Sequence, residues 1–355
     1  MADHHGSRDP RTRPADVFRM MLVVGAVVGL ALLLWYLADV LLLVFAAVLF
    51  AIILRSIAAP IERHTPIPPA GSLAIATLLI ASLVALFAYL LGAQIHSQVS
   101  SLLEQLPELL SDLGERLGVE ELRERLVDRL EAFSSRSGLV AQVAGYTSML
   151  NGAVANIVLV IVAGLYLAIH PMRYRDGLLK LVPQGRRARL GSAFDTAGRA
   201  LRLWLLGQLV SMTIVGVLVT AGLYAIGLPS ALALGFLAGV LEFVPLVGPA
   251  LSAVPALLLA LSEGGTTVLW VAGLYILVQQ VESNLIMPLV QRRALDLPPV
   301  VTLFAILSMG VLFGPLGILL GAPLTVVIYV AVKQLSVRDT LGEDQDIPGE
   351  DDSRR

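Results

Sequence analysis

The stretch that decides the fold is SALALGFLAGVLEFVPLVGPALSAVPALLLAL, residues 230–261. It carries a single charged side chain, Glu242. As one straight helix it would be roughly 50 Å long, against a bilayer hydrocarbon core of about 30 Å. Its Gly248-Pro249 pair lies near the middle, and proline removes a backbone donor and breaks a helix. The sequence therefore predicts a helix that is broken inside a membrane.

A second stretch, residues 298–332, is also too long for a single straight span and has a Gly314-Pro315 pair near its middle. Each stretch is either a re-entrant hairpin or a single kinked crossing. Two hairpins would leave Arg292 and Arg293 on the cytoplasmic side, which the positive-inside rule favours. Matched broken helices of opposite orientation are typical of secondary-transporter sites, although glycine and proline can also simply kink a membrane helix.

The composition agrees with a membrane protein. The chain has 355 residues, of which 57% are hydrophobic and 15% charged, whereas soluble domains carry about 25% charged residues. The mean hydropathy is +0.82, and the apolar residues form long unbroken runs. There are no cysteines, which excludes a disulfide scaffold, an iron–sulfur cluster and a cysteine-based zinc site.

The fold class that follows is an all-α polytopic membrane protein. We expect about six full transmembrane helices and two broken, re-entrant hairpins, eight hydrophobic segments in all, with an amphipathic helical segment outside the membrane. Residues 18–54 must form two helices, with a turn near Trp35, Tyr36 and Asp39 and an end at Arg55. The other ordinary spans are predicted near 70–92, 149–169, 203–226 and 267–288.

Five regions follow from this division. They are a polar cytoplasmic N-terminus (1–17), three transmembrane helices (18–92), an amphipathic extracytoplasmic segment (93–147), a transport core with the broken helices (148–335) and an acidic, disordered cytoplasmic tail (336–355). The amphipathic pattern is clearest over 95–136, where leucines recur every three to five positions between charged residues. It is either an oligomerisation or gating element or a packed cap on the membrane domain.

Charge asymmetry predicts the orientation. Residues 173–202 hold eight Lys and Arg against two Asp, and we interpret them as a cytoplasmic loop in the inner membrane of a bacterium. The N-terminus and the segment around Arg55 and Arg63 are also basic and fall on the same side. Both termini are therefore expected in the cytoplasm, with 95–136 on the opposite face.

Two carboxylates mark the candidate site. Between Arg202 and Arg292 there is no Lys or Arg, yet Glu242 and Glu282 lie within apolar segments. A deep carboxylate binds a cation, stays protonated or pairs with a distant arginine such as Arg199. The first two possibilities suit a carrier coupled to protons or sodium, and the third, for which Arg202 and Arg292 are further candidates, would be structural. The candidate substrate- or ion-binding residues are Glu242, Gln279, Gln280, Glu282 and Asn284.

Prolines and glycines supply a second set of candidates. Each removes a backbone donor or permits an unusual backbone conformation, so we expect these residues to break helices and to gate the site. The set comprises Pro245, Gly248, Pro249, Pro288, Gly314 and Pro315.

These motifs resemble the autoinducer-2 exporter family of bacterial permease-like proteins. The resembling segments are WLLGQ (204–208), EFVPLVGP (242–249), QQVESN (279–284) followed by Pro288, LPP (297–299) and GVLFGPLG (310–317). The resemblance covers most of residues 18–335. One departure is His170-Pro171, where many relatives carry an acidic residue. The resemblance implies export of a small signalling molecule in some members, cation/proton antiport in others, and assembly into homo-oligomers.

Other classes lack their motifs. There is no G-x-x-x-x-G-K-S/T loop for an ATP-driven pump and no H-E-x-x-H for a metalloprotease. We expect a transporter of a small solute or a cation, not an enzyme, with no metal, no cofactor and no nucleic-acid partner. A non-transporting scaffold or interaction protein is the alternative, although a scaffold has no use for buried Glu242 and Glu282.

Overall fold

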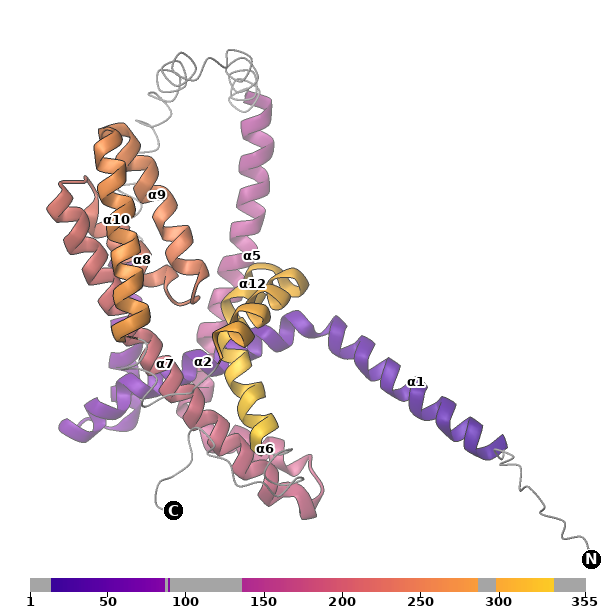
Figure 1. Cartoon of the computed structure of the whole chain (residues 1–355). Coiled ribbons are helices and arrows are strands. Elements are labelled where there is room, and N and C mark those ends of the chain that lie inside the picture. Colours follow the sequence, from indigo (N-terminus) through magenta and orange to yellow (C-terminus); the bar gives the residue numbers. More distant parts are fainter. Residues whose placement is uncertain (1–13, 87–88, 90–135, 287–297, 335–355) are drawn as a thin grey trace, which may run out of the picture.

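The computed structural model describes residues 14–86, 89, 136–286 and 298–334 (Figure 1). All regular elements in these ranges are helices, which confirms the all-α class. Four helices are long and apolar enough to cross a membrane: Ala38–His64, Pro69–Leu86, Gln184–Ile226 and Val300–Val332. The N-terminus, most of the amphipathic segment, residues 287–297 with Pro288 and Arg292, and the tail lie outside the described residues.

The first two helices meet where the sequence predicts. Helix α1 (Pro14–Tyr36) and helix α2 (Ala38–His64) are separated at Leu37. The predicted end of α2 at Arg55 is wrong, because the helix continues through Pro60 to His64. Proline removes one hydrogen bond from the last turns. The end is closed instead by Thr65, whose backbone N–H and hydroxyl both donate to the Ile61 carbonyl.

Helices α2 and α5 (Arg136–Ile169) run in the same direction, and α5 ends beside Arg55, before α2 reaches its own end at His64. Gly164 of α5 lies against Phe50 and Ala47, and the Arg55 Nε donates to the Ala168 carbonyl at 2.7 Å. The basic residues Arg55 and Arg63 in the last turns of α2 and the basic segment that follows α5 are thus at the same end of this pair, in line with the charge asymmetry. The side of the membrane to which that end belongs stays a prediction.

The basic segment 173–202 is not a loop. The apolar part of α5 bends by 89° into helix α6 (Pro171–Lys180), and helix α7 starts at Gln184 and continues to Ile226. At 43 residues, α7 is about 65 Å long and exceeds the bilayer core. Its charged N-terminal turns therefore extend the span beyond the membrane as helix, which hydropathy alone cannot distinguish from a loop.

A four-helix unit surrounds the first broken stretch. Helix α8 (Ala231–Leu241) returns along α7, and Gly216 and Gly239 bring the two backbones into contact. A break over 242–246 leads to α9 (Val247–Glu263), and Gly264 leads to α10 (Gly265–Val281), which continues as the π-helical turn η1 (Glu282–Ile286). Helix α9 packs against both α8 and α10, and α10 packs against α7 (Figure 1). Buried side chains from all four helices form one apolar core.

The second broken stretch folds back on itself. Helix α12 (Pro299–Val332) is interrupted at Gly314, whose φ of 61° is in the left-handed region. The arms then lie side by side, since Gly321 approaches Ile306 and Gly317 approaches Met309. In a straight helix, Ile306 and Gly321 would be roughly 22 Å apart. The predicted hairpin form is therefore present in the fold, whereas its depth in a bilayer and the count of eight segments stay predictions.

Candidate functional site

Glu242 is the first residue after α8 and the start of the break. It is 0% exposed, and neither carboxylate oxygen has a hydrogen-bond partner among the described residues. Its backbone is held at both ends, because its N–H donates to the Ala238 carbonyl and its carbonyl accepts from the Gln208 Nε2 on α7. The fold thus fixes the main chain of Glu242 and leaves its charge-bearing atoms without a partner.

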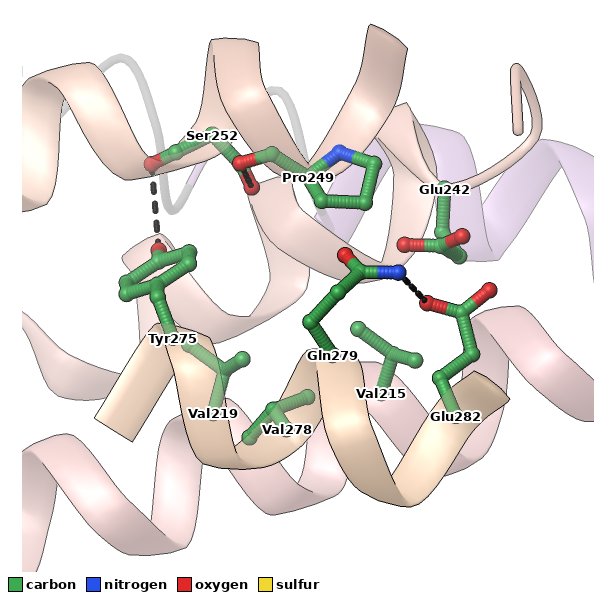
Figure 2. A pocket seen from close by; sticks show the side chains of 9 residues that line it. All are labelled: Val215, Val219, Glu242, Pro249, Ser252, Tyr275, Val278, Gln279 and Glu282. Atoms are coloured by element: carbon green, nitrogen blue, oxygen red, sulfur yellow. Dashed lines mark hydrogen bonds between the residues drawn. The ribbon is translucent and has the colours of Figure 1, made fainter. Parts of the chain in front are cut away.

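Glu282 faces Glu242 from the other side of the site. It begins η1, is 5% exposed, and accepts one hydrogen bond from the Gln279 Nε2 at 3.0 Å. Figure 2 shows the two carboxyl groups turned toward each other, near enough to interact directly. Two facing carboxylates repel each other unless one is protonated or a cation lies between them. Among the described residues, no Lys or Arg forms an ion pair with either carboxylate.

A small cavity adjoins the pair. Its volume is about 10 Å³, and about 10–15 Å³ holds one water molecule. Tyr275 lines it, and the Tyr275 hydroxyl donates to the Ser252 carbonyl at 3.0 Å, which links α10 to α9. The lining side chains come from α7, α9, α10 and the break: Val215, Val219, Glu242, Pro249, Ser252, Tyr275, Val278, Gln279 and Glu282 (Figure 2).

Only part of the predicted polar face reaches this cavity. Glu242, Gln279 and Glu282 line it, whereas Gln280 and Asn284 are exposed on the opposite side of the helix. The Asn284 Nδ2 donates to the Gln280 side-chain oxygen at 2.9 Å and to its backbone carbonyl at 3.0 Å. Their placement gives them a local partner each, and a binding role for them stays a prediction.

The π-helical turn is a feature that the sequence did not suggest. Its wider winding leaves carbonyls of the preceding turn to be satisfied by side chains, as Asn284 does for Gln280 and the Ser283 hydroxyl does for Gln279 at 2.9 Å. The turn starts at Glu282 and therefore sets where this carboxylate points. The polar QQVESN run, with Ser and Asn able to bond backward along a helix, is the signal that could have indicated it.

The predicted helix breakers act in different ways. Pro245 is in the break itself, and Pro249 is in the first turn of α9 and in the cavity wall. Gly248 permits a close approach, because a Cβ there would be 2.1 Å from the Leu241 carbonyl oxygen. Leu246, which carries no such signal in the sequence, has a φ of 71°, a conformation that costs on the order of 1–2 kcal/mol outside glycine. Strain of this kind is concentrated at functional sites.

Sequence reasoning also missed three residues that build the site. Gln208 appeared only within a family-like segment, and Tyr275 and Ser252 are ordinary residues of apolar helices. Their common signal is a polar side chain on a helix that is otherwise apolar, which must find a partner inside the protein.

Comparison with known protein families identifies the family to which this chain belongs. Residues 24–336 match the description "AI-2E family transporter". The chain belongs to the AI-2E family. The broken helices and the paired carboxylates are therefore parts of a multi-pass membrane transporter rather than of an enzyme.

Named relatives show the same affiliation. The chain is 25% identical to the AI-2 transport protein TqsA of Escherichia coli (strain K12), over 89% of this chain and 92% of TqsA. It is 28% identical to YhhT of the same strain, over 82% of this chain and 84% of YhhT. It is 37% identical to YrrI of Bacillus subtilis (strain 168), where the match spans 42% of each chain, less than half the length of that relative.

Proposed function

We propose that this AI-2E family member is a secondary transporter in which a proton or a small monovalent cation binds between Glu242 and Glu282 and drives the movement of a small polar solute. The observation that carries the proposal is Glu242, fully buried with both carboxylate oxygens unpartnered and a second carboxylate facing it. Two such groups in an apolar core repel each other unless a proton or a cation is shared. A reversible occupant of that kind is what coupled transport requires.

The cavity is too small to hold the transported solute, so the coupling site and the solute path are different places. A volume of about 10 Å³ accepts a proton, a water molecule or a single small cation, but no organic molecule. The solute is therefore expected to move along another route, and occupancy of the carboxylate pair sets which conformation is open. An autoinducer-2-like molecule is the first solute to test, because TqsA is named as an AI-2 transport protein. Exchange of a cation for protons is the second.

The broken helix supports the same proposal. At the end of α8 the last carbonyls have no following turn, so they need other partners or an ion. Gln208 donates a hydrogen bond to the backbone carbonyl of Glu242. The Glu242 carboxylate oxygens, in contrast, have no hydrogen-bond partner among the described residues. Irregular backbone at membrane depth is tolerated where it is buried in protein or lines a cavity. Discontinuous helices of this kind form the ion sites of many secondary transporters.

The test is transport in proteoliposomes with imposed proton or sodium gradients. Glu282→Gln keeps the shape and removes the charge, so we expect gradient-driven transport to be lost while insertion and assembly are unchanged. Glu263→Gln is the matched control, because Glu263 ends α9, is exposed and should have no effect. Normal transport by Glu282→Gln, with unchanged pH and sodium dependence, would refute the coupling role. Loss of assembly would show instead that Glu282 is structural.

We also propose the orientation, with both termini cytoplasmic. The support is the basic character of the last turns of α2 and of the segment after α5, which lie at the same end of that helix pair. Because the chain has no cysteine, single cysteines at Ser7, Ser111 and Ser353 would report their side by labelling with an impermeant reagent. Labelling of position 111 only from the cytoplasmic side would contradict the proposal.

A further inference from the structure

Helix α6 turns away from the membrane span that precedes it. The apolar part of α5 and α6 meet at 89°, so if α5 crosses the bilayer, α6 lies along its surface. Four of its ten residues are charged, Arg173, Arg175, Asp176 and Lys180, which excludes a position in the hydrocarbon core. The end of α5 is fixed by Arg55, which donates to the Ala168 carbonyl. The bend therefore occurs at the edge of the membrane.

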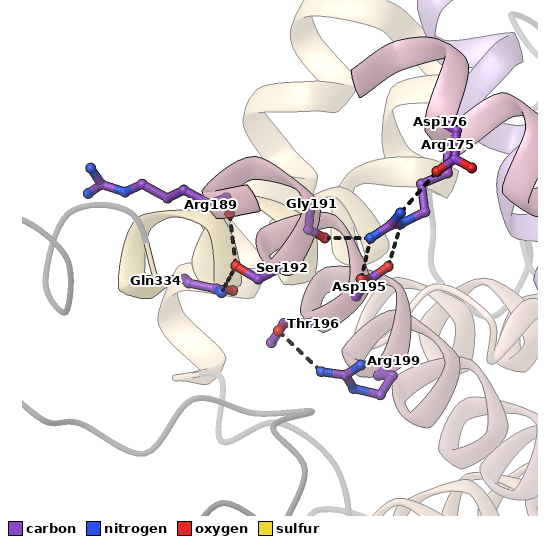
Figure 3. A network of polar contacts seen from close by, with 9 residues as sticks. All are labelled: Arg175, Asp176, Arg189, Gly191, Ser192, Asp195, Thr196, Arg199 and Gln334. Carbon is purple, nitrogen blue, oxygen red and sulfur yellow. Dashed lines mark hydrogen bonds and ion pairs between the residues drawn. The ribbon is translucent and has the colours of Figure 1, made fainter. Parts of the chain in front are cut away.

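Contacts with α7 fix how α6 is rotated about its axis. The Arg175 guanidinium donates to both carboxylate oxygens of Asp195, with Nε 2.7 Å from Oδ1, and to the Gly191 carbonyl (Figure 3). Leu179, one turn further, also approaches Gly191. A two-point guanidinium–carboxylate pair is directional and holds the helix in one orientation. The face with Arg175 and Leu179 is thus covered by α7.

The neighbouring face of α6 is apolar and uncovered. Tyr174, Leu178 and Leu181 follow an i, i+4, i+7 spacing and share one stripe. They are 43%, 55% and 83% exposed, respectively. Arg173 and Lys180, which are seven residues apart, lie on a second exposed stripe beside the apolar stripe. Their long side chains can extend past the apolar residues toward lipid headgroups. Apolar residues bordered by basic ones are the pattern of a helix that lies in the interface of a bilayer.

We propose that α6 is an interfacial helix that inserts Tyr174, Leu178 and Leu181 among the lipids and binds anionic phospholipid headgroups through Arg173 and Lys180. The occupant is the bilayer rather than another protein because the stripe continues directly from a membrane span and its flanking charges are basic. Through Arg175 and Asp195, α6 is attached to the helix that carries Gln208. The lipid surface thereby anchors the element on which the carboxylate site is built.

The test uses the full-length chain in vesicles of phosphatidylcholine with or without phosphatidylglycerol. A bimane label on Leu181→Cys should be quenched by lipid nitroxides, whereas the same label on Asp176→Cys, on the opposite flank, should be quenched by a water-soluble nitroxide. Both positions are exposed, so neither substitution disturbs the core. Quenching of position 181 from water alone would overturn the proposal. Protection of position 181 from both quenchers would also overturn it and would indicate a second copy or the chain's own acidic tail as the cover.

The headgroup preference is measured separately. The ratio of quenching at position 181 by nitroxide-labelled phosphatidylglycerol to that by labelled phosphatidylcholine reports local enrichment of the anionic lipid. Each basic residue near a membrane surface is expected to contribute about fivefold in affinity. Arg173→Gln and Lys180→Gln should each lower the ratio, whereas Arg63→Gln, an exposed arginine at the end of α2, should leave it unchanged. A ratio equal to one in the unmodified background would remove the headgroup assignment.

Discussion

Both α8–α9 and α12 are broken near a Gly-Pro pair, but they carry different chemistry. The α8–α9 break starts at Glu242, which is buried without a side-chain partner and faces Glu282. Helix α12 has no charged residue between Pro299 and Val332, and its two arms pack on each other and on an apolar core shared with α2 and α7. The same backbone device thus serves two purposes. A break creates irregular backbone at depth, and a carboxylate at the break is what makes it a candidate ion site.

The two breaks also need glycine for different reasons. At Gly248 there is no room for a side chain, because an added Cβ would be 2.1 Å from the Leu241 carbonyl oxygen. At Gly314 the space is open, with nothing within 4 Å of the added Cβ, but φ is 61°. The first is a steric demand of packing between α8 and α9, and the second is a conformational demand of the chain reversal. Substitutions can therefore test the two hairpins separately.

The largest effect on stability is expected from Gly248→Ala. The clash is with backbone rather than with a flexible side chain, so α9 must move relative to α8, at a cost on the order of 3 kcal/mol. We expect a lower thermal midpoint in detergent and no transport. Gly273→Ala, within α10 and with open space around it, gives a comparison in the same unit and should have little effect. An unchanged midpoint for Gly248→Ala would show that the break is more adaptable than its geometry indicates.

Glu242→Leu should change stability in the opposite direction. Removing a buried carboxylate that has no partner relieves a cost of about 1–3 kcal/mol, while the leucine fills a similar volume. We expect a higher thermal midpoint together with complete loss of coupled transport. Function that is maintained at the expense of stability distinguishes an ion site from a structural one. A lower midpoint would instead mean that Glu242 has a partner on which the fold depends.

Sequence patterns were sufficient for the breaks and for the burial of the carboxylates. A Gly-Pro pair within an overlong apolar stretch leaves little alternative to a broken helix, and Glu242 and Glu282 stood out because no Lys or Arg is near them in the chain. The identity of the lining amides could not be predicted. The polar residues of 279–284 cover more than half of the helix surface at 100° per residue, so the face that turns inward depends on tertiary packing. The π-helical turn changes that face further by altering the winding from Glu282 onward.

The basic segment 173–202 is a region whose structure could not be predicted from the sequence. Hydropathy separates lipid-facing from water-facing residues, but a helix that emerges from the bilayer has the composition of a loop. Residues 184–202 continue α7 as helix, and 171–180 form α6, because tertiary contacts such as the pairing of Arg175 with Asp195 stabilise them. Such long-range partners, twenty positions apart, have no short-range signature in the sequence.

A moderate effect is expected from Gly314→Ala. With a φ of 61° and a ψ of −144°, Gly314 has a backbone conformation that costs a non-glycine residue on the order of 1–3 kcal/mol, but no atom obstructs the new methyl group. We expect a small fall in thermal midpoint and transport that retains its pH and sodium dependence, because the carboxylate site is on the other hairpin. If transport loses its pH and sodium dependence, rather than only becoming slower, α12 takes part in ion binding.

Of the substitutions at the two hairpins and their partners, controls aside, Gln208→Leu is expected to lower stability least. Its effect on the carboxylate site, and so on coupled transport, should be larger. Gln208 donates its Nε2 hydrogen to the Glu242 carbonyl, where α8 has stopped and no following turn supplies an N–H. Leucine is close in size, so the change removes the hydrogen bond at a cost of about 1 kcal/mol and leaves the packing in place. The main chain of Glu242 then loses its link to α7, and the carboxyl group is no longer held opposite Glu282. Coupled transport should fall several-fold more than stability does.

Thr325→Val is the matched control for Gln208→Leu. Thr325 is also buried, and its hydroxyl donates to the Gly321 carbonyl at 2.7 Å within the second arm of α12. That carbonyl lies inside a continuous helix, so losing the hydroxyl leaves no backbone group unsatisfied and should affect neither stability nor coupling. If both variants lower transport equally, the two hairpins respond alike to the loss of a buried hydrogen bond. If only Gln208→Leu does so and shifts the pH dependence, Gln208 is a positioning residue for the carboxylate pair, and the asymmetry between the two breaks is functional.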